Sequence, residues 1–150
     1  MKSLFDKSDC QEMKGRIQNL QDSSRAQWGT MSVTQMMAHC QQPLRIALGL
    51  TTSKRSVAGV LFGKFARKKM MIPEESFRKN LPTDKSFVVA NTLTFGEERE
   101  TLLKLVEQFS GRGASGIPTN IHPFFGRLNP HEWDVLTWKH LDHHLRQFGA

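Results

Sequence analysis

The chain has 150 residues, of which 38% are hydrophobic and 23% charged, a balance typical of one soluble globular domain spanning residues 1–150. Its net charge of +7 favours acidic partners or small anionic substrates. No apolar run approaches the roughly 20 residues that cross a bilayer, and two cysteines are too few for a disulfide framework. The first ten residues contain no apolar core, so we do not expect them to act as a signal peptide. We therefore expect a reduced, cytoplasmic protein.

Helical periodicity predicts a first helix over residues 3–22 and a second that begins near Ser32. Ser32 followed by Gln35 is a capping-box pattern, and a stripe of apolar residues continues from there at helical spacing. Pro43 interrupts this stripe and has no N–H for the carbonyl of His39, four residues back. We expect a kink beside that histidine, or another donor to its carbonyl.

Residues 51–93 form a long connection. Within it, Ser56 to Met71 can form a short basic amphipathic helix, whereas Pro73 and Pro82 favour extended or turn geometry. A connection of this length is too long for a tight bundle loop. It therefore either crosses the helical bundle or covers one end of it.

Two further helices follow this connection. One opens at Thr94 and runs to about Ser110, where a run of glycines ends it. The last helix is the best marked, because Asn129 is a good N-cap, Pro130 occupies the first helical position and the pattern continues to Phe148. These four helices and one long crossover between the second and the third predict an all-α four-helix bundle.

Histidines on the last helix suggest a metal site. His140 and His144 lie four residues apart, so both imidazoles face one side of the helix. On a helical wheel both fall inside the buried arc, whereas His143 lies at its edge. Each buried ring needs polar partners, and a metal ion satisfies one nitrogen of each. The alternative is a pair of ordinary core or rim histidines with protein partners.

His39, on the second helix, can supply a third imidazole. Taken alone, a histidine on the flank of an apolar stripe is more often a packed core residue than a ligand. Joined to the pair on the last helix, it completes a three-histidine site with an open position, the arrangement of catalytic rather than structural zinc. Cys40 points about 100° away from His39 on the helix, so we expect it to be a small buried core residue.

Other residues could assist such a site. His122 can contact substrate or add a ligand, although a loop histidine bonded to nearby backbone is the simpler explanation. Gln147 lies on the histidine face and can orient a ligand, although packing or a bond at the helix end is the simpler role. The GRGASG string of residues 111–116 follows a helix, so it is no dinucleotide site. The basic segment 54–69 fits a solvated face, so we expect neither nucleic acid nor membrane as a partner.

Two stretches, WGTMSVTQMMAHC (28–40) and HPFFGRLNPHEWDVLTWKHLDHHLRQFG (122–149), resemble the DinB/YfiT-like superfamily of metalloenzymes, and in particular a subfamily that is a domain of unknown function. The pattern of that superfamily in its last helix is His-x-x-x-His with a Gln three residues later. His140, His144 and Gln147 match it here.

The resemblance implies a DinB/YfiT-like bundle and a divalent metal, zinc or nickel, held by His39, His140 and His144. The additional His143 departs from the simplest pattern of the superfamily. Members of known activity include thiol-dependent transferases and isomerases that use low-molecular-weight thiols. Some members are dimers, so a homodimer is one of the oligomeric states that remain open.

Three neutral imidazoles leave a divalent ion its full charge and at least one open position. A bound water then has a pKa near 7, or a thiol binds as thiolate, and either is a nucleophile at neutral pH. We therefore hypothesise a metal-dependent S-transferase or hydrolase that acts on a small electrophile. The alternative is a non-catalytic helical bundle that binds metal or a protein partner.

Overall fold

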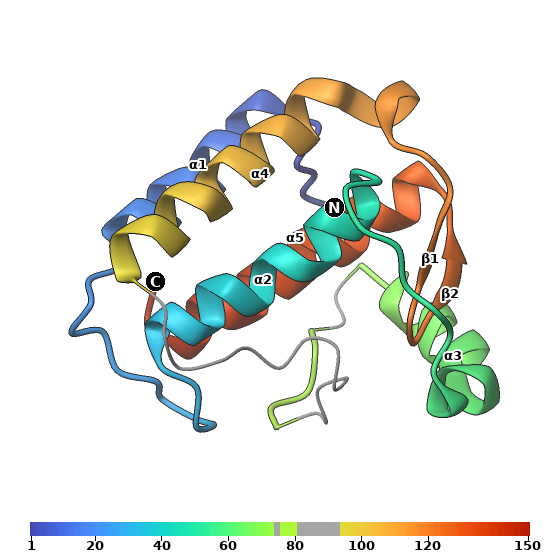
Figure 1. The fold of residues 1–150 in the computed structure, drawn as a ribbon, viewed down its shortest axis with the longest axis horizontal. Helices are drawn as coiled ribbons and strands as arrows, with labels where there is room; N and C mark the ends of the chain where they lie inside the picture. Colours follow the sequence, from blue (N-terminus) through green and yellow to red (C-terminus); the bar gives the residue numbers. More distant parts are fainter. Residues whose placement is uncertain (74–75, 81–93) are drawn as a thin grey trace.

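Four helices form the bundle in the computed structural model, which describes residues 1–73, 76–80 and 94–150 (Figure 1). These helices are α1 (Lys7–Asn19), α2 (Val33–Ala47), α4 (Phe95–Gly116) and α5 (Pro130–Gln147). α1 lies beside α4 and α2 beside α5, and α2 also packs on α4, so the two pairs form two layers. The predicted all-α bundle, with its long connection between α2 and α4, is confirmed.

The predicted helix starts agree with the capping chemistry. The Ser32 hydroxyl accepts a hydrogen bond from the Gln35 backbone N–H, and the Gln35 side chain accepts one from the Ser32 N–H. Asn129 forms the same reciprocal box with Glu132 at the start of α5. α2 continues through Pro43 as one helix. Local sequence therefore determines where these two helices begin.

Two helices have bounds that differ from the prediction. α1 is shorter than residues 3–22, because the Asp6 carboxylate accepts hydrogen bonds from the Ser8 and Asp9 N–H groups and starts the helix there. α4 runs past the predicted end at Ser110 as far as Gly116. Its interruption comes at Gly113, whose φ of 60° is readily adopted only by glycine.

A short antiparallel hairpin and helix α3 (Val57–Met70) lie together at one end of the bundle (Figure 1). α3 agrees with the predicted helix over residues 56–71, and the connection thus covers an end of the bundle. The turn expected at Pro82 lies outside the described residues. The sequence analysis missed the hairpin, whose strands β1 (Asn120–His122) and β2 (Gly126–Leu128) are only three residues each.

Two glycines fix the position of α3 against this hairpin. A Cβ atom on Gly59 would overlap the carbonyl oxygen of Pro123, and one on Gly63 would overlap that of Phe124. The helix therefore packs directly on backbone, at a distance that only glycine allows. Its opposite face remains exposed, with Phe65 77% accessible.

Two charged residues of α5, Glu132 and Lys139, are buried. The Glu132 carboxylate pairs with Arg67 of α3, with 2.6 Å between Arg67 Nε and Glu132 Oε1. The Lys139 ammonium donates to the backbone carbonyls of Met70, 2.8 Å away, and Ile72. Their burial is possible because Arg67 and the backbone at the end of α3 provide partners for both charges.

The buried arc predicted for α5 is confirmed. Its members are all buried: Trp133, Leu136, Thr137, Leu141 and Phe148. Cys40 is buried too, with its Sγ 3.6 Å from the sulfur of Met36, as expected for a core cysteine. In the part of the chain that the structure describes, no helix is long and apolar enough to cross a membrane.

Candidate metal centre

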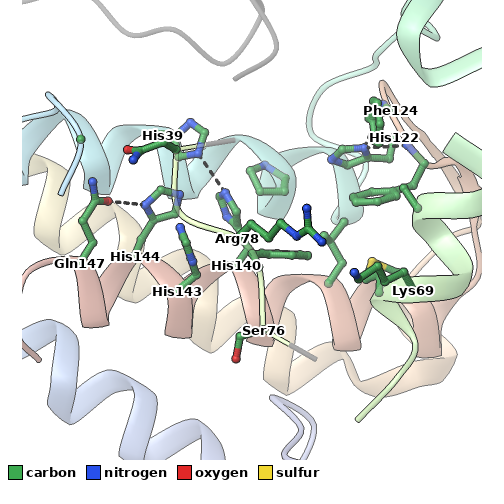
Figure 2. Close-up of a pocket in the computed structure, with 18 of the residues that line it drawn as sticks. His39, Lys69, Ser76, Arg78, His122, Phe124, His140, His143, His144 and Gln147 are labelled. Atoms are coloured by element: carbon green, nitrogen blue, oxygen red, sulfur yellow. Dashed lines mark hydrogen bonds between the residues drawn. The ribbon is translucent and has the colours of Figure 1, made fainter. Parts of the chain in front are cut away.

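Three histidines from two helices converge inside the bundle. His39 comes from α2, and His140 and His144 come from successive turns of α5 (Figure 2). Each pair of rings has its centroids 4.7–4.8 Å apart, and one nitrogen from each ring lies within 4.8 Å of the other two. Within residues 1–73, 76–80 and 94–150, this is the one group of three His, Cys, Asp or Glu side chains that could hold a metal ion.

Burial keeps the α5 pair neutral. It lowers the pKa of His140 well below 6.5, and the neighbouring His144 and His39 lower it further. It also lowers the pKa of His144 to about 3, with a further contribution from His39. A neutral imidazole has a lone pair that a metal ion can use, whereas an imidazolium has none. At pH 7 these two rings are therefore in the form that binds metal.

Gln147 determines which nitrogen of His144 is free. The Gln147 amide donates from its Nε2 to the backbone carbonyl of Trp28 at 2.6 Å, so its Oε1 must be the atom that faces His144. That oxygen lies 2.8 Å from Nδ1 of His144 and can only accept, which places the ring proton on Nδ1. The lone pair of His144 is then on Nε2, the state required of a metal ligand.

Gly29 makes room for this amide. Its φ is 77°, and a Cβ atom there would come within 2.8 Å of the Gln147 Nε2. The sequence analysis left the role of Gln147 open and favoured packing or a helix-end bond. The structure shows instead that Gln147 joins His144 to the loop before α2.

His39 and His140 are hydrogen-bonded to each other. Their Nε2 atoms lie 2.9 Å apart, so one donates a proton and the other accepts it. Two nitrogens on one tetrahedral zinc lie about 3.4 Å apart, given bonds of about 2.0–2.1 Å, so the rings need to separate only slightly. The Nδ1 of His140 is buried and has no hydrogen-bond partner among the described residues. The nitrogen donors and their spacing fit a metal ion that prefers imidazole.

The comparison with protein families identifies the chain. A family model described as "Protein of unknown function (DUF1569)" matches residues 3–150. The chain belongs to the DUF1569 family. No curated protein and no solved structure matches the chain. The family match includes all three histidines of the centre and Gln147, but its description names no activity.

A cavity of about 920 Å³ lies beside the histidines of this DUF1569 chain. Its walls are largely apolar and include Trp28, Phe77, Phe124 and Leu136. They come from the loop before α2, the segment 76–80, the hairpin turn and α5. The three histidines line this cavity, so a ligand inside it can reach them (Figure 2).

The two other candidate histidines also line the cavity, outside the three-histidine group. His143 is partly buried, its ring makes edge contacts with Trp28 and Phe77, and burial lowers its pKa. His122 is buried, and its Nδ1 accepts hydrogen bonds from the N–H groups of Phe124 and Phe125 at 3.1 and 3.3 Å. His122 is thus bonded to nearby backbone and also lines the cavity.

The sequence analysis missed the contribution of residues 76–80 to the cavity, among them Phe77 and Arg78. This segment has no helical or strand periodicity that could have placed it. Asp134 and Asp142, both near the histidines in sequence, do not support the centre. Asp134 accepts from the Leu4 N–H and Asp142 pairs with Arg16.

Proposed function

We propose that this protein is a metal-dependent enzyme in which His39, His140 and His144 hold one divalent ion, zinc or nickel. The observation that carries the proposal is the convergence of three imidazoles at the wall of a cavity of about 920 Å³. The group contains no fourth His, Cys, Asp or Glu among the described residues. Three protein ligands and space for a further one characterise catalytic zinc, whereas structural zinc has four protein ligands.

The resemblance to the DinB/YfiT-like superfamily supports the same proposal. Its His-x-x-x-His pattern with a following Gln corresponds to His140, His144 and Gln147. In the structure these residues form one connected unit, because Gln147 is hydrogen-bonded to His144, whose ring packs against that of His140. We accordingly propose superfamily membership, and with it a low-molecular-weight thiol as one substrate and a small electrophile as the other.

The residues around the centre have separate roles in this proposal. A divalent ion held there lowers the pKa of a coordinated water or thiol and so supplies a nucleophile at neutral pH. Gln147 keeps the proton of His144 on Nδ1, which leaves Nε2 for the ion. The apolar walls near Phe77 and Phe124 exclude water from the electrophile and strengthen the electrostatic interactions in the cavity.

Metal analysis of untagged protein tests the centre. We expect about one zinc or nickel per chain in the native protein. His140→Ala should lose the ion while circular dichroism shows the helices intact. His131→Ala is the matched control, because His131 is an exposed histidine on the first turn of the same helix. An unchanged metal content in His140→Ala would refute the proposed site.

A turnover assay tests the chemistry. The metal-loaded protein is incubated with 1-chloro-2,4-dinitrobenzene and, in turn, with glutathione, cysteine or coenzyme A, and product is followed by absorbance. We expect turnover with at least one thiol, its loss on removal of the ion with a chelator, and its return when the ion is restored. An ion bound without turnover by any thiol would indicate instead a non-catalytic metal-binding bundle.

A further inference from the structure

The described lining of the cavity beside the histidines contains positive and no negative side chains. Lys69 and Arg78 are its cations, and none of these lining residues is Asp or Glu. Lys69 interacts with another group of the protein, which leaves Arg78 as the cation available to a ligand. A divalent ion at the histidines would add to this charge. Positive groups in a hollow with apolar walls attract a negative ligand strongly, because the low-dielectric walls focus the field. The cavity therefore favours an anion over a neutral or cationic ligand of the same shape.

Arg78 is the residue best placed to bind such an anion. Figure 2 shows its side chain extending from the histidine group into the space between His140 and His122. Its guanidinium makes no hydrogen bond or ion pair within the part of the chain that the structure describes. The adjacent Lys79 does not share this role, because its ammonium lies over the ring of Trp28, 4.2 Å from the centroid.

Arg78 is exposed to the cavity, and two other arginines show the contrast between a paired and an unpaired guanidinium. Arg16 pairs with Asp142 and Arg67 with Glu132, so each of these guanidinium groups is used within the fold. An unpaired guanidinium at a cavity wall presents a flat array of N–H donors, which matches the two oxygens of a carboxylate. Arg78 can therefore bind a carboxylate without first breaking an ion pair.

The rest of the cavity requires an apolar ligand body. The ring of Phe124 packs edge-on against that of Phe125, with centroids 5.4 Å apart, and Phe77 belongs to the same segment as Arg78. These rings and Leu136 form a lining against which a hydrocarbon or aromatic group can pack. A ligand that uses the whole cavity thus has an apolar body and one negative group.

We propose that the cavity binds a small molecule with an apolar body and a carboxylate, and that the Arg78 guanidinium binds the carboxylate. The proposal rests on the proposed function in one respect, because it names the class of substrate that the metal centre would meet. The binding of the carboxylate by Arg78 does not itself require the ion. Arg78 in this role is a specificity determinant, since it distinguishes anionic molecules from neutral molecules of the same shape.

Three probes with one carbon skeleton test the proposal: 4-phenylbutanoate, 4-phenylbutanamide and 4-phenylbutylammonium. Their dissociation constants are measured by isothermal titration calorimetry, first on metal-free protein and then on zinc-loaded protein. We expect metal-free protein to bind the carboxylate about tenfold or more tightly than the amide, and the ammonium weakest. In Arg78→Gln the carboxylate should bind about as weakly as the amide, whose own affinity should not change.

Arg25→Gln is the matched control, because it makes the same change of charge at an exposed arginine outside this cavity. It should keep the preference for the carboxylate. The proposal is overturned if the metal-free protein binds the three probes equally or binds none, or if the preference survives in Arg78→Gln. A preference that appears only with zinc would overturn the role of Arg78 while supporting the metal centre. Failure of metal binding would leave the result on metal-free protein intact, so the two proposals fail separately.

Discussion

Replacement of Gln147 by methionine tests the link between the fold and the metal centre. Gln147 is 3% accessible, and its amide makes two hydrogen bonds, to His144 Nδ1 at 2.8 Å and to the Trp28 carbonyl at 2.6 Å. Methionine has nearly the same volume but can make neither bond, so the buried Nδ1–H of His144 and the partly buried carbonyl of Trp28 both lose their partner. At about 1–3 kcal/mol for each unsatisfied group, the free energy of unfolding should fall by about 2–6 kcal/mol.

Gln147→Met should also weaken metal binding. Without the Gln147 oxygen, nothing keeps the proton of His144 on Nδ1, and the ring loses the orientation that directs Nε2 toward the ion. Loss of such a partner typically costs about 10–100-fold in metal affinity. Urea unfolding measures the stability, and competition for zinc with a chromogenic chelator measures the affinity under conditions where circular dichroism shows the variant folded.

Gln147→Glu separates the two effects. A carboxylate at this position still accepts from His144 Nδ1 but cannot donate to the Trp28 carbonyl, so stability should fall while zinc affinity stays within a few-fold of the native value. Gln11→Met, at an exposed position on α1, is the control for the amide-to-thioether change and should alter neither quantity. The reasoning is refuted if folded Gln147→Met binds zinc as tightly as the native protein.

Two further predictions concern stability. Burial lowers the pKa values of His140 and His144 below 6.5 in the folded protein, so the unfolded chain takes up protons first as the pH falls. The metal-free protein should therefore lose about 1.4 kcal/mol per histidine between about pH 7.5 and 5.5, measured by urea unfolding, and a flat profile would contradict the neutral pair. Gly63→Ala places a methyl group against the Phe124 carbonyl and should cost about 1–3 kcal/mol or more in the same assay. Gly15→Ala, with open space around it in α1, should instead gain about 0.5–1 kcal/mol, and equal effects at the two glycines would refute the packing argument.

The parts of the fold that could be predicted from sequence are those determined by local chemistry. The reciprocal bonds at Ser32 and Asn129 involve residues only three positions apart, so the sequence alone shows where α2 and α5 begin. The pairing of His140 with His144 follows from the pitch of one helix. That His39 lies beside them depends on how α2 packs against α5, so it could be proposed from the sequence but not established.

What could not be predicted depends on contacts between distant segments. Glu132 and Lys139 have charged side chains typical of a solvated helix face, but they are buried because α3 supplies Arg67 and backbone carbonyls as partners. The hairpin strands are too short to have a detectable alternation of polar and apolar residues. Arg78 lies in a segment without periodicity, and only the three-dimensional structure shows that it reaches the cavity.

The contact between His39 and His140 has a consequence for the kind of ion that the centre would accept. Their Nε2 atoms lie 2.9 Å apart, so a cation that enters between them would have to separate the two rings and replace their hydrogen bond with bonds to itself. Such a cation must therefore bind imidazole more favourably than the rings bind each other. Magnesium and calcium prefer oxygen ligands, so the three imidazoles would discriminate against these hard cations in favour of transition metals.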